Sequence, residues 1–131
     1  MRILALDHGA VRTGVAISDE TATLARPLTV LQRVETDAGF AALCALVQSE
    51  APGSVVVGLP VSLEGREHAQ AKRARAFAAR LAGAVDLPVE LYDERFTSRL
   101  ADQRGGRAAR DACAAATLLE DYLRMIGERR P

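Results

Sequence analysis

The chain has 131 residues and a mass of 14.0 kDa, a size that predicts one domain covering residues 1–131. Its 49% hydrophobic and 26% charged residues argue against a mainly disordered, collagenous or disulfide-dense chain. Because 17 Lys and Arg balance 17 Asp and Glu, any binding of nucleic acid would depend on where the cations lie and not on an excess of them.

The sequence also indicates a cellular compartment. No apolar run reaches the length that spans a bilayer, and Met1 leads straight into a strand-like segment instead of a signal peptide. Cys44 and Cys113 lie among apolar neighbours with helical spacing, which suits a reducing environment. We therefore expect a cytoplasmic protein with no membrane partner.

The first half of the chain predicts three strands followed by a helix. An apolar run over residues 2–7 ends in an acid, and a glycine after it marks a turn. Residues 14–19 lie close enough to form a hairpin with this run, and residues 28–31 form a weaker third strand. Thr36 then caps a helix with one apolar face, which ends before Pro52.

The second half alternates strands and helices. Residues 54–59 form the clearest strand, and their uninterrupted valines predict burial on both faces, as in a parallel strand covered by helices. A long helix follows from about residue 64 to residue 84, and residues 88–92 form a fifth strand. Residues 103–110 read as a basic loop, and residues 111–126 as a last helix rich in alanine.

The predicted order of elements is therefore β-β-β-α-β-α-β-α. An early hairpin followed by two crossover helices describes a five-stranded mixed sheet with helices on both faces, which is an α/β architecture.

Acids at the ends of these elements are the candidate catalytic residues. Asp7 ends the first strand, Glu94 follows the fifth, and Asp111 opens the last helix. The first and fifth strands can both end at the sheet edge where α/β proteins form their crevices. Three converging carboxylates repel one another unless a divalent cation holds them, and hard oxygen ligands favour Mg²⁺ or Mn²⁺. Such ions promote in-line hydrolysis of phosphodiesters.

Each acid also has a purely structural interpretation. Asp7 can shape a turn, Glu94 can pair with Arg95, and Asp111 can cap its helix. The segment Asp7-His8-Gly9 further resembles the first phosphate loop of the actin and sugar-kinase ATPase fold. That fold needs two such domains to close over ATP, and 131 residues supply one.

Arginines gather in two places. Three of them recur every seven residues and form a stripe on the long helix: Arg66, Arg73 and Arg80. Four more crowd the predicted loop before the last helix: Arg99, Arg104, Arg107 and Arg110. A cationic loop beside an acidic metal site suits a phosphodiester substrate, while a solvated helix face and a mobile loop are the structural alternative.

Four motifs occur in order along nearly the whole chain. They are Leu6-Asp7-His8-Gly9 with Arg12 and residues 14–19, Val57-Gly58-Leu59-Pro60 with Gly65, residues 93–98 from Asp93 to Ser98, and residues 111–115 with Leu118, Leu119, Tyr122 and Leu123. Together they resemble the YqgF family of bacterial Holliday junction resolvase-like proteins, also described as pre-16S rRNA nucleases. The resemblance implies an RNase H-like fold related to the RuvC-type resolvases and metal-dependent cleavage of structured nucleic acid.

The resemblance also assigns roles to residues. It implies that Asp7, Glu94 and Asp111 hold the catalytic metals. The motif residues that flank them, together with the basic loop, are candidate contacts to nucleic acid: Arg12, Arg95, Thr97, Arg104, Arg107 and Arg110. The chain departs from the family pattern at Ala10 and Val11, where polar residues are usual, and at Gly58, near which resolvase relatives carry an acid.

The leading hypothesis is a Mg²⁺- or Mn²⁺-dependent endonuclease that matures the 5′ end of pre-16S rRNA, acting as a monomer or homodimer. Two alternatives stay open: a Holliday junction resolvase acting on branched DNA, and a non-catalytic assembly factor that binds ribosomal precursor RNA. A nucleotide-binding ATPase fragment is a third class, and it would require affinity for ATP.

Overall fold

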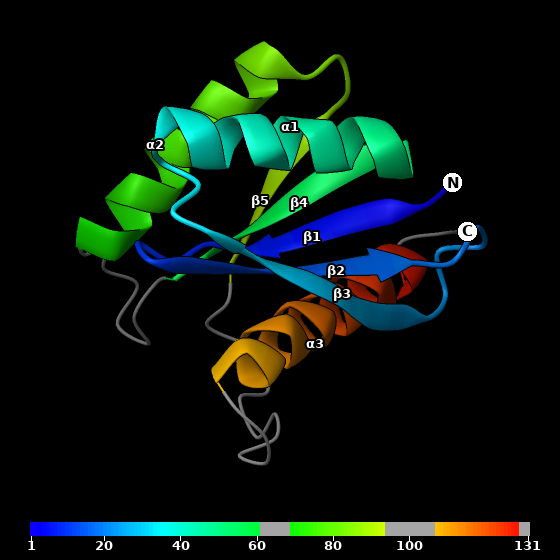
Figure 1. Cartoon of the computed structure of the whole chain (residues 1–131). Coiled ribbons are helices and arrows are strands. Elements are labelled where there is room, and N and C mark those ends of the chain that lie inside the picture. The colour runs from blue at the N-terminus through cyan, green and yellow to red at the C-terminus, as the bar shows by residue number, and fades with distance from the viewer. Residues whose placement is uncertain (61–68, 94–106, 129–131) are drawn as a thin grey trace.

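The structure is a computed structural model that describes residues 1–60, 69–93 and 107–128, with the backbone alone described for residues 107–110. Five strands form one mixed sheet in the order β3-β2-β1-β4-β5, with α1 and α2 on one face and α3 on the other (Figure 1). The predicted order of elements and the placement of helices on both faces are confirmed. The bounds are β1 Ile3–Asp7, β2 Arg12–Ser18, β3 Ala25–Gln32, α1 Asp37–Glu50, β4 Ser54–Leu59, α2 Ala69–Ala84, β5 Val89–Asp93 and α3 Arg107–Glu128.

Parallel strands form the centre of the sheet. β1 pairs with β4 in parallel, with Leu4 opposite Val55 and Leu6 opposite Val57, and β4 pairs in parallel with β5. The valines of β4 are buried on both faces of the sheet, as the uninterrupted apolar run predicts. Consequently β1, β4 and β5 all end at the same edge of the sheet, called the carboxyl edge below.

The antiparallel half of the sheet is longer than predicted. β2 begins at Arg12 instead of residue 14, and β3 begins at Ala25 instead of residue 28. β3 includes Pro27 because it is an edge strand of the sheet, where a residue without an N–H group breaks no inner ladder. Composition alone underestimates such a strand, because pairing with β2 keeps its polar residues extended.

Alternating side chains along β1 divide the core in two. Leu4 and Leu6 pack with α1 and α2, whereas Ile3 and Ala5 pack with α3. α1 begins as predicted, because the Thr36 hydroxyl accepts a hydrogen bond of 3.1 Å from the Gly39 amide. None of the helices within the described ranges is both long and apolar enough to cross a membrane.

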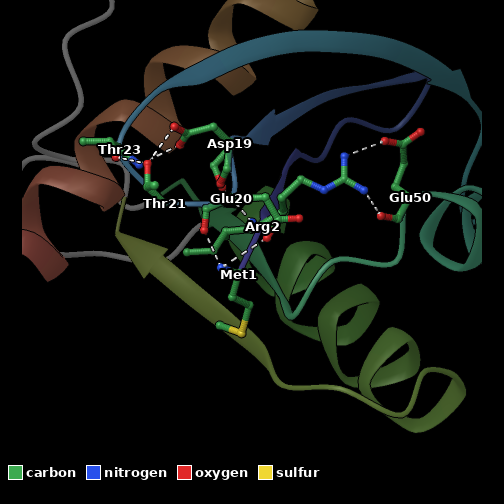
Figure 2. A network of polar contacts seen from close by, with 9 residues as sticks. Met1, Arg2, Asp19, Glu20, Thr21, Thr23 and Glu50 are labelled. Atoms are coloured by element: carbon green, nitrogen blue, oxygen red, sulfur yellow. Dashed lines mark hydrogen bonds and ion pairs between the residues drawn. The ribbon is translucent and has the colours of Figure 1, made fainter.

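A polar network lies at the end of the sheet opposite the carboxyl edge (Figure 2). Arg2 forms an ion pair with Glu50 at 3.4 Å and so joins the start of β1 to the end of α1. Asp19 accepts hydrogen bonds from the Thr23 amide at 2.8 Å and the Thr21 hydroxyl at 2.7 Å, which orders the turn between β2 and β3. These bonds lower the pKa of Asp19 to about 2, the bond from Thr23 contributing most.

Two tyrosines connect β5 to α3. The hydroxyl of Tyr92 on β5 donates to Asp121 of α3 at 3.2 Å, and the hydroxyl of Tyr122 on α3 donates to Glu90 of β5. The two rings meet edge to face, with centroids 5.5 Å apart. β5, the outer parallel strand, is therefore held to α3, the helix on the face of the sheet opposite α1 and α2.

Candidate functional site

Asp7 is the last residue of β1 and lies at the carboxyl edge, as predicted. It is half-buried, and by strand alternation its side chain points to the same face as Ile3 and Ala5, which is the face covered by α3. Across the hairpin its register partner is Gly14 of β2. The Cα atoms of such partners lie about 4.5–5.5 Å apart, so Gly14 is the direct neighbour of Asp7 on the adjacent strand.

Gly14 is the point where α3 comes closest to the sheet. A Cβ atom built on Gly14 would lie 2.0 Å from the backbone carbonyl oxygen of Asp111 and 2.5 Å from its carbonyl carbon. The backbone of Asp111 therefore lies directly over Gly14 and beside Asp7. Sequence reasoning missed this role, although a glycine inside a buried strand is a known signal of close backbone approach.

Asp111 does not open its helix, so the prediction that it does is wrong. α3 begins one turn earlier, at Arg107, and the helical conformation of residues 107–110 replaces the end of the predicted loop over residues 103–110. The physical reason is that arginine and alanine are strong helix formers, so the helix continues through them. The capping interpretation of Asp111 falls with this, and its side chain is left for other contacts.

The contact that Asp111 makes is with Arg12, the first residue of β2. Arg12 Nε donates to Asp111 Oδ2 at 2.7 Å, and the two side chains are 29% and 32% exposed. The two residues are 99 positions apart in the sequence. β2 thus contacts both parts of Asp111, with Gly14 under its backbone and Arg12 on its carboxylate.

The remaining predicted residues are not described in the same detail. Glu94, Arg95, Thr97 and Arg104 lie outside the described residues, and Glu94 follows directly after Asp93, which ends β5 at the carboxyl edge. Arg107 and Arg110 lie in the first turn of α3, where only the backbone is described. Across residues 1–60, 69–93 and 107–128, no three His, Cys, Asp or Glu side chains gather as a metal site.

The acids that the structure does describe suit a hard divalent cation. Asp7 and Asp111 carry carboxylate oxygens, the ligands that Mg²⁺ and Mn²⁺ prefer, and both residues are partly exposed. The backbone of Asp111 lies over Gly14, the register partner of Asp7. Arg12 takes one oxygen of Asp111, and a carboxylate has lone pairs on both oxygens for further ligands. Glu94 would add a third carboxylate from the neighbouring chain segment, as the sequence predicts.

His8 points to the opposite face of the sheet from Asp7. Its ring stacks on Phe77 of α2, with centroids 4.6 Å apart, and its side chain is 1% exposed. Neither ring nitrogen has a hydrogen-bond partner, although Nε2 lies 3.3 Å from the Glu35 carboxylate. Burial lowers the pKa of His8 below its usual 6.5, outweighing the carboxylate of Glu35, while Arg73 adds to the lowering.

This burial predicts a loss of stability in mild acid. The unfolded chain binds a proton at His8 near pH 6.5, whereas the folded chain binds it only at lower pH, so the free energy of unfolding falls as the pH drops below about 6.5. The slope from this one group cannot exceed about 1.4 kcal/mol per pH unit. Urea unfolding at pH 7.5 and 5.5 measures it, and His8→Phe, which keeps the ring stack, should remove this part of the pH dependence. Equal pH dependence in both proteins would contradict the assignment.

The arginine stripe on α2 is engaged in contacts within the protein. Arg73 pairs with Glu35 at 2.7 Å, and Arg80 pairs with Asp37 at 3.3 Å while its guanidinium lies 3.9 Å from the centre of the Phe40 ring. Both join α2 to the start of α1. The structural alternative therefore describes these two residues better than a surface for nucleic acid does, and Arg66 lies outside the described residues.

Known proteins resemble the chain along nearly its whole length. A family model described as "RuvX: Holliday junction resolvase" matches residues 1–125. A protein of Anaeromyxobacter sp. (strain Fw109-5), named "Putative pre-16S rRNA nuclease", is 42% identical over 132 residues, which is 94% of this chain and 96% of its own. A Cupriavidus taiwanensis protein of the same name is 41% identical over 121 residues, covering 92% and 86%.

Solved structures place the fold among RNase H-like resolvases. RuvC of T. thermophilus, solved in complex with a Holliday junction substrate, superposes with a TM-score of 0.61 at 18% identity, covering 97% of this chain and 96% of that one. A Fowlpox virus resolvase bound to Holliday junction DNA superposes with a TM-score of 0.56 at 12% identity, covering 96% and 99%. The RNase H-like fold implied by the sequence motifs is confirmed.

Proposed function

The chain belongs to the RuvX family, and from this premise we propose that it is a divalent-metal-dependent endonuclease that hydrolyses phosphodiester bonds of structured nucleic acid. We further propose that it processes the 5′ end of pre-16S rRNA in the cytoplasm, as a single nuclease domain. The names of the relatives support the RNA substrate. The observation that carries the proposal is the close approach of the Asp111 backbone to Gly14, the register partner of Asp7, at the carboxyl edge of an RNase H-like sheet.

In this proposal Asp7, Glu94 and Asp111 hold Mg²⁺ or Mn²⁺. When bound, such a cation activates the attacking water and stabilises the charge that develops on the phosphate. Gly14 lets the backbone of α3 approach β2, which brings the backbone of Asp111 over the register partner of Asp7. Arg12 offsets part of the negative charge of the two acids before any cation is bound.

Contacts to the nucleic acid are proposed for the basic residues near the start of α3. Arg104, Arg107 and Arg110 lie within one stretch of sequence just before Asp111, and Arg95 and Thr97 follow Glu94. Cations placed beside a metal site guide a phosphate backbone to it. Arg12 belongs to the same sequence-based prediction, and in the structure its guanidinium binds Asp111.

A parallel cleavage experiment tests the proposed function. A labelled pre-16S rRNA fragment and a four-way DNA junction are incubated with the protein in Mn²⁺ or in EDTA, and the products are resolved at nucleotide resolution. Metal-dependent cleavage of the RNA at its 5′ boundary is the expected result. Cleavage of the junction alone would make the protein a resolvase, and binding of RNA without metal-dependent cleavage would favour a non-catalytic assembly factor.

Replacing Arg104 and Arg107 by Ala should weaken binding to nucleic acid and reduce its salt dependence. Each lost phosphate contact lowers the slope of log K against log salt by about 0.9 for duplex DNA and about 0.7 for single strands. Binding titrations in EDTA at several salt concentrations measure the slope. The double variant Arg26→Ala, Arg124→Ala removes equal charge from exposed positions away from the carboxyl edge, and equal slopes for the two double variants would argue against a specific role for the basic segment.

A further inference from the structure

Arg12 is bound to another residue of the protein, a contact that a role in binding nucleic acid alone does not require. Its Nε lies 2.7 Å from Asp111 Oδ2, which is the distance of a charge-assisted hydrogen bond. Both side chains are about two-thirds buried, so the pair is screened less by solvent than a surface ion pair. Asp111 is one of the two described acids at the proposed metal site.

The position of Arg12 is fixed by the strand that carries it. Arg12 begins β2 opposite Gln32 of β3, and the amide of Arg33 donates to the carbonyl of Val11 at 2.8 Å. Two residues further along the same strand, Gly14 lies under the backbone of Asp111. One strand therefore fixes where the Asp111 backbone lies and which way one of its carboxylate oxygens faces.

We propose that Arg12 is a positioning residue for Asp111 in the metal site, an inference that rests on the proposed function. Arg12 binds one carboxylate oxygen and leaves the other for the cation. It also offsets one of the two negative charges that Asp7 and Asp111 bring together at the carboxyl edge. Hydrogen-bonding partners of metal-ligating carboxylates commonly act in this way, by fixing the orientation of the ligand.

The competing role of Arg12 is a direct contact with a phosphate of the substrate. That role would use the Nη groups of the guanidinium, whereas the observed bond is made by Nε to Asp111 and the side chain is 29% exposed. The two roles predict different losses when the residue is replaced. A positioning residue affects metal affinity without nucleic acid present, whereas a phosphate contact affects nucleic-acid affinity and its salt slope.

The test compares Arg12→Met with Arg2→Met. Arg2 is a matched control, because it is similarly buried and ion-paired with Glu50, at the opposite end of the sheet. Isothermal titration of the full-length, metal-free protein with Mn²⁺ should show about 10–100-fold weaker binding for Arg12→Met and unchanged binding for Arg2→Met. Arg12→Lys keeps the charge without the planar guanidinium and should restore part of the affinity.

The same two variants, Arg12→Met and Arg2→Met, are then compared for binding to a four-way junction and to precursor RNA in EDTA. The inference predicts that Arg12→Met changes the salt slope by less than one phosphate contact, which is about 0.9 for duplex DNA. Wild-type Mn²⁺ affinity in Arg12→Met would overturn the inference. So would a lost phosphate contact in the salt slope with Mn²⁺ affinity intact, which would return Arg12 to the nucleic-acid interface.

Hydrogen exchange in EDTA separates this inference from the proposed function. Losing the contact to Asp111 should speed amide exchange over residues 111–118 in Arg12→Met relative to Arg2→Met. If the wild type binds no Mn²⁺ and cleaves nothing, the proposed function fails, while faster exchange would still support the hold of Arg12 on Asp111. Equal exchange in the two variants would overturn that hold whatever the metal does.

Discussion

Replacing Asp7 by Asn should abolish cleavage of nucleic acid and leave the fold intact. Asn keeps the shape of the side chain at the end of β1 but removes the charge that a divalent cation requires. The substitution also removes one of two like charges near the carboxyl edge, and the similar size of the amide should leave the fold in place. The measurement is cleavage of the labelled precursor RNA and the four-way junction in Mn²⁺, with the expected activity equal to that of the wild type in EDTA.

A second carboxylate controls for the loss of charge itself. Asp86 is exposed in the turn before β5, at the other end of the sheet, and Asp86→Asn should cleave like the wild type. Urea unfolding of all three proteins checks that any loss of activity is not a loss of fold. A fully active Asp7→Asn protein would remove Asp7 from the mechanism and with it the metal site proposed at this edge.

The sequence was sufficient to predict the frame that positions Asp7. An unbroken run of valines over residues 54–59 indicates a strand buried on both faces, and such a strand needs helices on both sides of the sheet. Once β4 is parallel to β1 and to β5, the ends of these strands must share an edge. The acid that ends β1 could therefore be assigned to the carboxyl edge from periodicity and order alone.

Asp111 shows where such reasoning stops. Asp is a good capping residue, so a helix start at Asp111 was the natural prediction, yet the residues before it are strong helix formers and α3 begins at Arg107. The prediction that Asp111 is a site residue does not depend on this boundary, because the path of α3 across β2 sets where Asp111 lies. The sequence around Asp111 does not predict that path.

Arg12 is the other residue whose contact differs from the sequence-based prediction, and the reason is that its partner lies far away in the chain. Arg12 and Asp111 are 99 positions apart, and no pattern within either segment indicates that the two would pair. Family motifs placed both residues near the site but could not distinguish a contact to phosphate from a contact to a ligand carboxylate. Only the fold, through the hairpin that starts β2, brings the guanidinium to the acid.

His8 illustrates the same limit on the other face of the sheet. The run Asp7-His8-Gly9 predicts a turn, where a histidine is ordinarily exposed. Here α2 covers the position, and the ring is buried against Phe77 because the alternation of side chains along β1 continues one residue beyond its end, to His8. Asp7 thus lies at the carboxyl edge, whereas its neighbour His8 packs into the core.

Replacing Gly14 by Ala should cost about 3 kcal/mol or more of folding free energy, the upper end of what overpacking a tight interior usually costs. The added Cβ atom would lie 2.0 Å from the backbone oxygen of Asp111, and a backbone atom cannot give way as a side-chain end can. Either α3 moves away from β2 or the strand does, and both displace Asp111 from Asp7. Urea unfolding measures the stability, and Mn²⁺ titration of the folded fraction at low temperature measures the site.

The same substitution elsewhere in the chain should have the opposite effect. Gly83 lies in α2 with no atom within 4 Å of an added Cβ, so Gly83→Ala should raise stability by roughly 0.5–1 kcal/mol through its better helix propensity. The two variants add an identical methyl group, so the difference between them isolates the close approach of α3 to β2. If Gly14→Ala were as stable as the wild type and bound Mn²⁺ equally well, the contact that brings Asp111 beside Asp7 would not exist as described, and the carboxyl edge would need another second ligand.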